Sequence, residues 1–272
     1  MYHLAAYAAE GLSHLIKRFN YNNNLLGSVN LINASVNQNV KCFVFTSSIA
    51  VYGAGQAPMT EDIIPVPEDS YGIAKLAVEQ ELWVTHEMFG LDYILFRPHN
   101  VYGERQNIGD RYRNVVGIFI NQLLRGEPMT IFGDGAQVRA FTHIDDVAPI
   151  IAGFVEYDAA RRNQVFNIGA DQPYTVNELS RIVADAMGVD HKVAYLAPRN
   201  EVKIAFADHS KAERVFNTSQ KKLLREGIQA MAEWVRLHGS RESSVFQDIE
   251  VLKKLPPSWA SVAASHACAG RV

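Results

Sequence analysis

The residues best suited to chemistry are a tyrosine and a lysine in the segment SYGIAKLAVEQELW (70–83). Tyr71 and Lys75 are four residues apart at the start of a predicted helix, so their side chains lie on one face of it. A lysine ammonium beside a tyrosine stabilises the phenolate and lowers the pKa of the phenol, which makes it a general acid or base near neutral pH. A single pair of this spacing is a weak signal, so its interpretation depends on its surroundings.

The segment FTSSIAVYG (45–53) supplies a hydroxyl partner. A predicted strand ends at Thr46, and Ser47 and Ser48 follow at its carboxyl end, where ligands bind in open α/β sheets. Ser48 can hydrogen bond to a substrate hydroxyl and to the Tyr71 phenol together. Seen alone, the segment is better explained as a serine-rich turn with no chemistry.

Short apolar runs alternate with helical patterns along the chain, which predicts an α/β fold with a Rossmann-like, doubly wound parallel sheet. Near-continuous apolar runs are typical of strands that are buried on both faces. After a strand end at 2–6, the predicted strands are KCFVFT (41–46), DYILFR (92–97) and QVFNIG (164–169). The predicted helices are 8–19, 22–36, 71–89 closed by Gly90, 145–155, one from the capping box TVNE (175–178) to Gly188, and 218–238.

The later loops are rich in arginine and asparagine and indicate a second lobe. We predict a dinucleotide-binding domain from residues 1–102, with 141–170 contributing to its sheet. A smaller α/β substrate-binding lobe is expected from 103–140 and 171–259. The tail 260–272 is small and weakly patterned, which predicts disorder.

The composition excludes several classes of function. Of 272 residues, 48% are hydrophobic and 20% are charged, with a net charge of −3, so no surface for coating nucleic acid is predicted. No apolar run approaches the roughly 20 residues that span a bilayer, and the start lacks a signal-peptide pattern. Cys42 and Cys268 suggest neither a disulfide framework nor a metal site, and no HxxxH or HExxH pair occurs. We expect a cytoplasmic protein without a metal.

Five motifs occur in order along the chain, and together they are far more specific than any one of them. They are HLAA (3–6), FTSSIAVYG (45–53), YGIAK (71–75), RPHNVYG (97–103) and GDGAQVRAFTHIDDV (133–147). With these motifs and the closing LPPSW, residues 2–259 resemble the extended short-chain dehydrogenase/reductase superfamily. The resemblance is to its NAD-dependent epimerase/dehydratase family, in particular to the nucleotide-sugar epimerases related to UDP-glucose 4-epimerase.

The resemblance implies a catalytic triad of Ser48, Tyr71 and Lys75. Tyr71 would take the proton from the 4-hydroxyl of a UDP-hexose while bound NAD accepts hydride, and Lys75 would hold the nicotinamide ribose. The 4-keto sugar would then turn over and receive hydride on its other face. The implied reaction is an NAD-dependent 4-epimerisation.

The resemblance also implies the binding residues. Those assigned to NAD are Leu4, Ala5, Ala6, Asn24, Tyr71, Lys75 and His99, although Asn24 is open to the alternative of a helix-surface residue. Those assigned to the nucleotide sugar are Ser48, Asn100, Asn114, Arg139 and Arg199. Planar guanidinium groups suit a diphosphate; the spacing around Arg199 is one residue shorter than usual. His143, in FTHIDD, is expected to have a structural role.

The residues after Ser48 discriminate among members of the family. Sugar 4,6-dehydratases have an Asp-Glu pair there, whereas this chain has Ile49 and Ala50, which transfer no proton. Epimerisation is therefore favoured over elimination, and a 4-reductase stays open. Ala205 matches the position that gates the 2-substituent of the sugar, and a small residue leaves room for an N-acetyl group.

The first residues, MYHLAAYAAEG, suggest that the chain starts within a sheet. No G-x-G-x-x-G or G-x-x-G-x-x-G turn opens a helix in the sequence, and such a turn holds the dinucleotide pyrophosphate. We expect that the glycine-rich βαβ part precedes residue 1, and that these 272 residues bind NAD poorly. Tight NAD binding in calorimetry would contradict this expectation. A fragment that only binds nucleotide sugar is the alternative to an enzyme.

A homodimer is a further possibility. Members of the family often dimerise through two helices per subunit, and residues 74–89 and the helix from Asn22 are the candidates. The alternative is that both apolar stripes face the core.

Overall fold

A four-stranded parallel sheet forms the centre of the computed structural model, which describes all residues except 154–160, 200, 219–220, 244 and 261–272. The strand order is β1-β2-β3-β8. The strands are β1 (Tyr2–His3), β2 (Cys42–Thr46), β3 (Asp92–Pro98) and β8 (Gln164–Ile168). The predicted α/β fold with a parallel sheet is confirmed.

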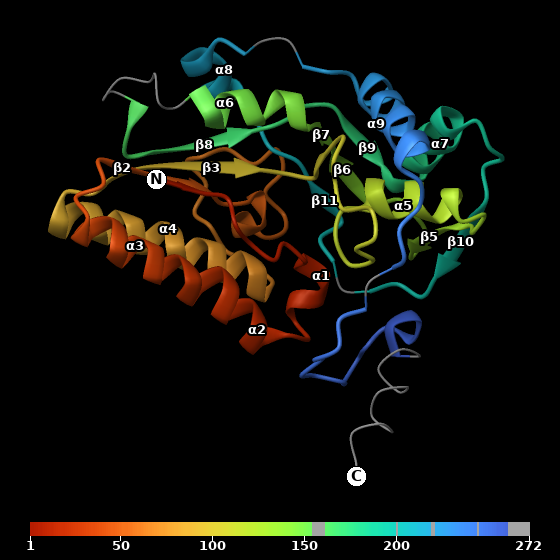
Figure 1. Cartoon of the computed structure of the whole chain (residues 1–272), viewed down its shortest axis with the longest axis horizontal. Helices are drawn as coiled ribbons and strands as arrows, with labels where there is room; N and C mark the ends of the chain where they lie inside the picture. The colour runs from red at the N-terminus through yellow and green to blue at the C-terminus, as the bar shows by residue number, and fades with distance from the viewer. Residues whose placement is uncertain (154–160, 200, 219–220, 244, 261–272) are drawn as a thin grey trace.

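Helices cover both faces of this sheet (Figure 1). One face carries α3 (Gly27–Asn37) and α4 (Ser70–Phe89), and the other carries α6 (Ala148–Ala152) and α8 (Ser210–Phe216). Alternate residues of β2 divide between the layers: Phe43 and Phe45 pack with Ile32 and Leu82, whereas Val44 packs in the cluster of α6 and α8. Strand β2 is thus buried on both sides, which explains its continuous apolar run.

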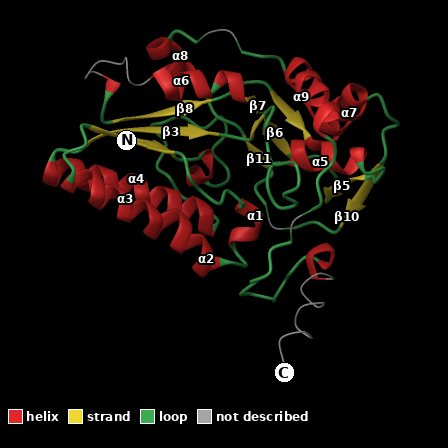
Figure 2. Ribbon diagram, viewed as in Figure 1, coloured by secondary structure: helices red, strands yellow, loops and turns green. Residues whose placement is uncertain are grey.

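A second group of elements lies beyond the carboxyl ends of the strands (Figure 2). Its helices are α5 (Val115–Leu124), α7 (Val176–Met187) and α9 (Leu224–His238). Its strands are β4 (Val101–Tyr102), β5 (Met129–Phe132), β6 (Val138–Ala140), β7 (Thr142–His143), β9 (Pro173–Thr175), β10 (Val193–Leu196) and β11 (Ile204–Ala205). They form the small sheets β4-β7, β5-β10 and β11-β6-β9. The three helices share one hydrophobic cluster, which includes Phe119, Val183 and Met231.

Four predicted helices differ from the observed ones. The helix expected over 145–155 is a 3₁₀ turn over Ile144–Asp146 followed by α6, and residues 154 and 155 lie outside the described part of the chain. The helix expected over 8–19 is divided into α1 (Glu10–Ser13) and α2 (Lys17–Tyr21), because Leu15 and Ile16 turn into a local apolar cluster. The helix expected from residue 22 begins with a π-helical turn over Asn22–Leu26. The last helix begins at Leu224 rather than at 218, and just before it the Asp146 carboxylate accepts a hydrogen bond from the Lys222 backbone N–H at 3.1 Å.

Segments from the two ends of the chain pack against each other near α1 and α2 (Figure 1). Phe246 lies 4.8 Å from Phe19 and 5.8 Å from Tyr7, measured between ring centroids. The Glu250 carboxylate accepts hydrogen bonds from the backbone of Arg18 and Phe19 at 2.9 and 3.0 Å, which caps α2. The predicted disorder of 260–272 falls, apart from Ala260, outside the described residues.

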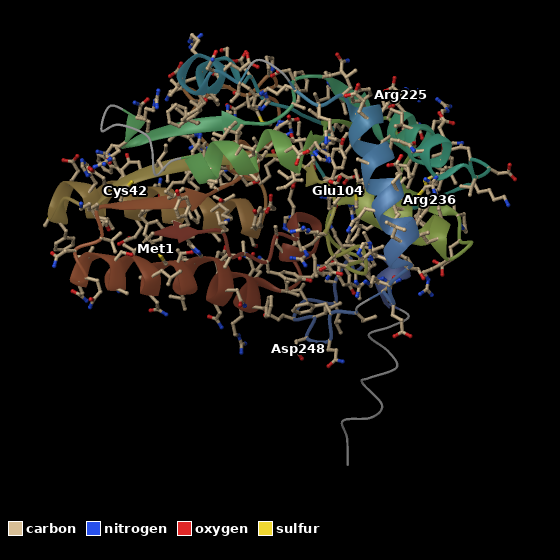
Figure 3. All side chains as sticks on the ribbon, turned by 45° about the horizontal axis from the view of Figure 1, so that its top comes forward. Met1, Cys42, Glu104, Arg225, Arg236 and Asp248 are labelled. Carbon is tan, nitrogen blue, oxygen red and sulfur yellow. The ribbon has the colours of Figure 1, made fainter. Side chains whose placement is uncertain are left out.

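The two ends of the sheet have different surroundings. Met1 and Cys42 lie at the amino end of the sheet, away from Glu104 in the loop after β4 (Figure 3). The Met1 amino group donates to the Cys42 carbonyl at 2.8 Å. The carboxyl ends of the strands face the second lobe, which leaves this end for a site. No helix in the described part of the chain has the length and apolarity to cross a membrane.

Candidate active site

A cavity of 420 Å³ at the carboxyl ends of β1, β2 and β3 contains Ser48, Tyr71 and Lys75 in its wall. The start of α4 is held there by Asp69, whose carboxylate accepts hydrogen bonds from the backbone N–H groups of Tyr71 and Gly72 at 2.8 and 2.9 Å. A Cβ on Gly72 would lie 2.5 Å from the Ala50 carbonyl oxygen. Glycine therefore allows α4 to approach the turn after β2.

The Tyr71 side chain is buried and lines the cavity together with Ser48. Burial raises the Tyr71 pKa above its ordinary value; the Ser48 side chain opposes this shift, and the Glu10 and Asp69 carboxylates add to it. The expected lowering of this pKa by Lys75 is therefore wrong for the structure as it stands. The Lys75 ammonium lies 5.8 Å from the Tyr71 ring centroid.

Lys75 is oriented by the end of β2. Its Nζ donates to the Thr46 carbonyl at 2.6 Å and lies 4.5 Å from the centre of the Phe45 ring. Burial lowers the Lys75 pKa to about 7, and the Glu79 carboxylate one turn further along α4 opposes this shift. Protonated Lys75 presents a cation to the cavity, and its protonation changes near neutral pH.

A buried polar network lies behind this lysine. The Arg97 guanidinium forms a two-point contact with the Glu79 carboxylate, with Nε and Oε1 2.9 Å apart. Ser47 donates to the same carboxylate, and Arg97 also donates to the Tyr52 hydroxyl at 2.8 Å. Both charged side chains are about 5% exposed. The network joins α4 to the ends of β2 and β3, so it fixes the frame that carries Ser48, Tyr71 and Lys75.

The residues assigned to the cofactor fall into two groups. Leu4, Ala6 and His99 line the 420 Å³ cavity beside Tyr71 and Lys75, whereas Ala5 is exposed outside it.

Asn24 is buried, which contradicts a helix-surface position. Its amide accepts from the Tyr7 backbone N–H at 2.8 Å and donates to Asn20 at 2.8 Å and to the Tyr7 carbonyl at 3.1 Å. Since its donors and acceptor are engaged within the protein, Asn24 holds the segment after β1 and lies outside the wall of the cavity.

The residues assigned to the nucleotide sugar, except Ser48, meet in an adjoining cavity of 210 Å³. Its wall contains Asn100, Asn114, Arg139 and Arg199. Asn100 and Asn114 also line the larger cavity, so the two cavities form neighbouring parts of one cleft. The Asn114 Oδ1 atom is buried without a partner among the described residues, and it is an acceptor available to a ligand.

The two arginines are held differently. Arg139 donates to the backbone carbonyls of Val138, Val202 and Lys203. Arg199 stacks 4.4 Å from the Phe132 ring centroid and pairs with Glu201 at 3.2 Å. The Glu201 carboxylate occupies the position on Arg199 where an anionic ligand would bind. A diphosphate suits this half of the cleft because both guanidinium groups line it.

Sequence reasoning missed the acidic residues of the cleft. Glu10 lines both cavities and also a smaller one of 60 Å³ next to Ser48, Asp69 and Ala205. Although the Glu10 side chain is exposed to the cleft, loss of solvation raises its pKa to about 7, with Asp69 adding to the shift and Arg139 and Arg199 opposing it. The segment AAEGL contains no signal for such a role, because the position of Glu10 depends on how α1 folds against α4.

His143 lies in the core rather than in the cleft. Its ring is buried 5.4 Å from the Tyr102 ring centroid, and its Nδ1 accepts from the Asp145 backbone at 3.2 Å. This agrees with the expected structural role. Within the residues that the structure describes, no group of three His, Cys, Asp or Glu side chains is arranged to hold a metal ion.

The chain is similar to proteins of one family. The profile of the NAD dependent epimerase/dehydratase family matches residues 1–169. A UDP-glucose 4-epimerase of Mycolicibacterium smegmatis is 32% identical over 240 residues, which are 87% of this chain and 75% of that protein.

Solved structures give the same result. A UDP-glucose 4-epimerase of Thermotoga maritima, crystallised with UDP-glucose, has a TM-score of 0.82 and 35% identity over 87% of this chain and 77% of that one. A UDP-glucuronic acid 4-epimerase of Bacillus cereus, in complex with UDP-glucuronic acid and NAD, has a TM-score of 0.81 and 29% identity over 87% and 75%.

Proposed function

Since the chain belongs to the NAD dependent epimerase/dehydratase family, we propose that it catalyses NAD-dependent 4-epimerisation of a UDP-hexose. The observation that carries the proposal is that Ser48, Tyr71 and Lys75 line one cavity at the carboxyl end of β2. Residues Ile49 and Ala50 after Ser48 form a short turn and have no group that transfers a proton.

Each member of the triad receives a role that its environment supports. Tyr71 is the general acid and base at the sugar 4-hydroxyl, and Ser48 orients that hydroxyl while it hydrogen bonds to Tyr71. Because burial opposes the Tyr71 phenolate, a nearby cation is needed to stabilise it. Lys75 supplies that cation when its ammonium turns from the Thr46 carbonyl toward the cleft.

The residues of the larger cavity fit the nicotinamide riboside part of NAD. Leu4 and Ala6 offer an apolar wall, Lys75 offers a donor to ribose hydroxyls, and the buried Thr46 Oγ1 has no partner within the described chain. NAD, when bound there, supplies reversible oxidation of the sugar at C4. The chain's own contribution is to hold the sugar against Tyr71 and to move one proton.

A direct assay tests the proposal. Because NAD is expected to bind weakly, the chain is supplied with NAD in large excess over the protein. With UDP-glucose it is then expected to form UDP-galactose without net consumption of NAD or release of water. UDP-N-acetylglucosamine is expected to react as well, since the small Ala205 side chain lines the cavity beside Ser48. Consumption of NADPH would instead identify a reductase, and tight substrate binding with no turnover would identify a protein that only binds nucleotide sugar.

Glu10 favours a second candidate function, elimination of water. A dehydratase needs a second acid or base, and Glu10 has a pKa raised to about 7 in the same cavity as Tyr71. Formation of a 4-keto-6-deoxy sugar, followed by mass spectrometry, would identify this reaction. If Glu10→Gln no longer formed this product but still epimerised the sugar, the elimination would be assigned to Glu10.

Glu10 also makes substrate affinity depend on pH. The Glu10 pKa is raised to about 7, so the side chain is mostly neutral at pH 6 and mostly ionised at pH 8. The charge of the diphosphate is constant over this range, and an ionised Glu10 repels it. The affinity for UDP-glucose is therefore expected to fall roughly threefold to tenfold from pH 6 to pH 8. Calorimetry of the wild type, Glu10→Gln and the exposed control Glu233→Gln checks this. If the affinity for UDP-glucose changed equally with pH in all three proteins, the prediction would be wrong.

We propose further that the chain is cytoplasmic and forms a homodimer through α4 and the helix that begins at Asn22. Large apolar side chains along α4 support the dimer: Ile73, Trp83, Val84, Met88 and Phe89 are exposed by 44 to 68%. Sedimentation at micromolar concentration is expected to show a dimer that Trp83→Glu converts to monomer. A wild-type monomer would contradict this.

The domain division is also a proposal. The dinucleotide-binding domain comprises residues 1–102 with 141–170, and the substrate-binding lobe comprises residues 103–140 with 171–259.

A further inference from the structure

Three polar side chains connect the wall of the catalytic cavity to the surface. His99 follows β3 and lines the cavity; its Nε2 lies 3.0 Å from His209 Nε2, and His209 Nδ1 lies 2.5 Å from Asp171 Oδ1. The imidazole rings are parallel to within 22°. His209 is fully buried and His99 nearly so, whereas the Asp171 side chain is 54% exposed. No step of the proposed reaction uses His209 or Asp171.

The hydrogen atoms in this chain of contacts can be counted from its ends. The Ala140 carbonyl, 3.1 Å from His99 Nδ1, can only accept, so this nitrogen carries the hydrogen and a neutral His99 presents a lone pair at Nε2. At the other end, His209 Nδ1 shares a hydrogen with the Asp171 carboxylate. Suppose that His209 were neutral and Asp171 ionised. The Nε2 atoms of His209 and His99 would then both carry lone pairs, and no hydrogen would lie between them. The 3.0 Å contact therefore requires one additional proton on the His209–Asp171 pair.

The surrounding charges favour an ionised Asp171 carboxylate and a neutral His99, which leaves His209 as the place for the additional proton. Burial and then the charge of His209 lower the His99 pKa to about 3, which makes His99 the neutral member. Burial would raise the Asp171 pKa, but the hydrogen bond and charge of His209 and the charge of Lys221 outweigh it and lower this pKa. Lys221 itself donates to the Gly169 carbonyl at 2.8 Å and pairs with Glu213 at 3.5 Å, so it does not replace His209 as the partner of Asp171.

The position of His99 affects the substrate side of the cavity. The Ala140 carbonyl accepts from His99 and also from the Asn100 side-chain amide, at 3.0 Å. Asn100 lines both parts of the cleft and has a positive φ of 41°, so its backbone depends on its neighbours to hold it. Both nitrogens of His99 are engaged, so it offers no hydrogen bond to a ligand and acts by position.

We propose that Asp171, His209 and His99 form a positioning relay in which a buried His209 imidazolium orients the His99 ring and the Asn100 amide at the wall of the sugar-nucleotide cavity. The effect on catalysis rests on the proposed epimerase function. The positions of the hydrogen atoms on Asp171, His209 and His99 do not depend on that function, and they can be measured without substrate.

Nitrogen-15 NMR of the full chain with labelled histidine tests the relay. At pH 7, His209 is expected to carry hydrogen on both nitrogens and His99 only on Nδ1. In Asp171→Asn, His209 is expected to become neutral at pH 7, while the exposed control Asp190→Asn leaves it protonated. A neutral His209 in the wild type, or one that stays protonated in Asp171→Asn, would overturn the proposal.

Substrate binding supplies a second readout. UDP-glucose affinity is expected to fall about tenfold in Asp171→Asn, the loss typical of one hydrogen bond to a charged group, and to be unchanged in Asp190→Asn. If the chain binds UDP-glucose but does not convert it, the proposed epimerase function is wrong. The NMR and affinity measurements still test the relay in that case. Unchanged affinity in Asp171→Asn, despite a neutral His209, would refute the positioning role.

Discussion

Replacement of Tyr71 by phenylalanine is expected to slow the turnover of UDP-glucose by about 10³-fold, within the range for removal of a general acid or base. The phenol lies in the wall of the cavity with Ser48 and Lys75, and phenylalanine keeps its shape without its proton. Because the ring stays in place, the affinity for UDP-glucose is expected to change little.

Steady-state kinetics and calorimetry on the same preparations check this prediction. Tyr195, an exposed tyrosine on β10, supplies the control, and Tyr195→Phe is expected to retain the wild-type turnover rate. A Tyr71→Phe protein whose turnover rate stays within tenfold of wild type would show that another group moves the proton, and Glu10 would then be the first residue to replace.

Removal of the Glu79 carboxylate is expected to have the largest effect on stability. Glu79→Ala leaves the buried Arg97 guanidinium without its ionic partner and removes the acceptor of Ser47. Loss of one partner from a buried ion pair costs about 3–5 kcal/mol in the free energy of unfolding. Urea unfolding followed by circular dichroism measures it.

An exposed ion pair provides the matched control. Arg225 and Asp185 lie 3.3 Å apart with side chains that are 69% and 66% exposed, and Asp185→Ala is expected to change the free energy of unfolding by less than about 1 kcal/mol. If Glu79→Ala costs no more than Asp185→Ala, the buried network does not hold the catalytic frame.

The sheet and the clustering of Ser48, Tyr71 and Lys75 were predictable because their signals are local. Each strand over 41–46, 92–97 and 164–169 is recognisable from its own apolar run, and Tyr71 and Lys75 are one helical turn apart. The carboxyl-edge rule for parallel sheets then placed Ser48 beside them. The cavities, with Ser48, Tyr71 and Lys75 lining one of them, agree with that placement.

What was missed depends on contacts that no short segment encodes. Glu10 reaches the cleft because α1 and α2 fold against α4, where Asn20 binds the Ser70 carbonyl at 2.7 Å. His99 and His209 are 110 residues apart and meet only in the folded protein. The Tyr71 pKa was predicted to be lowered because helical spacing shows that Lys75 is near. The spacing does not show that the phenol is buried, and burial raises the pKa.

The packing of Phe246 and Glu250 on α2 has a consequence for the order of folding. The same part of the chain brings Trp259 to 5.1 Å from the Tyr112 ring centroid, and the Trp259 ring lies 5.8 Å from the Arg199 guanidinium, beside the diphosphate half of the cleft. Domains fold as units while the ribosome delivers them from the N-terminus. Here the helices α1 and α2 receive their cap and aromatic partners only after Phe246 and Glu250 have been synthesised. We therefore expect the cleft to be completed late in synthesis, because Tyr7 and Phe19 lack their aromatic partner until Phe246 has been added.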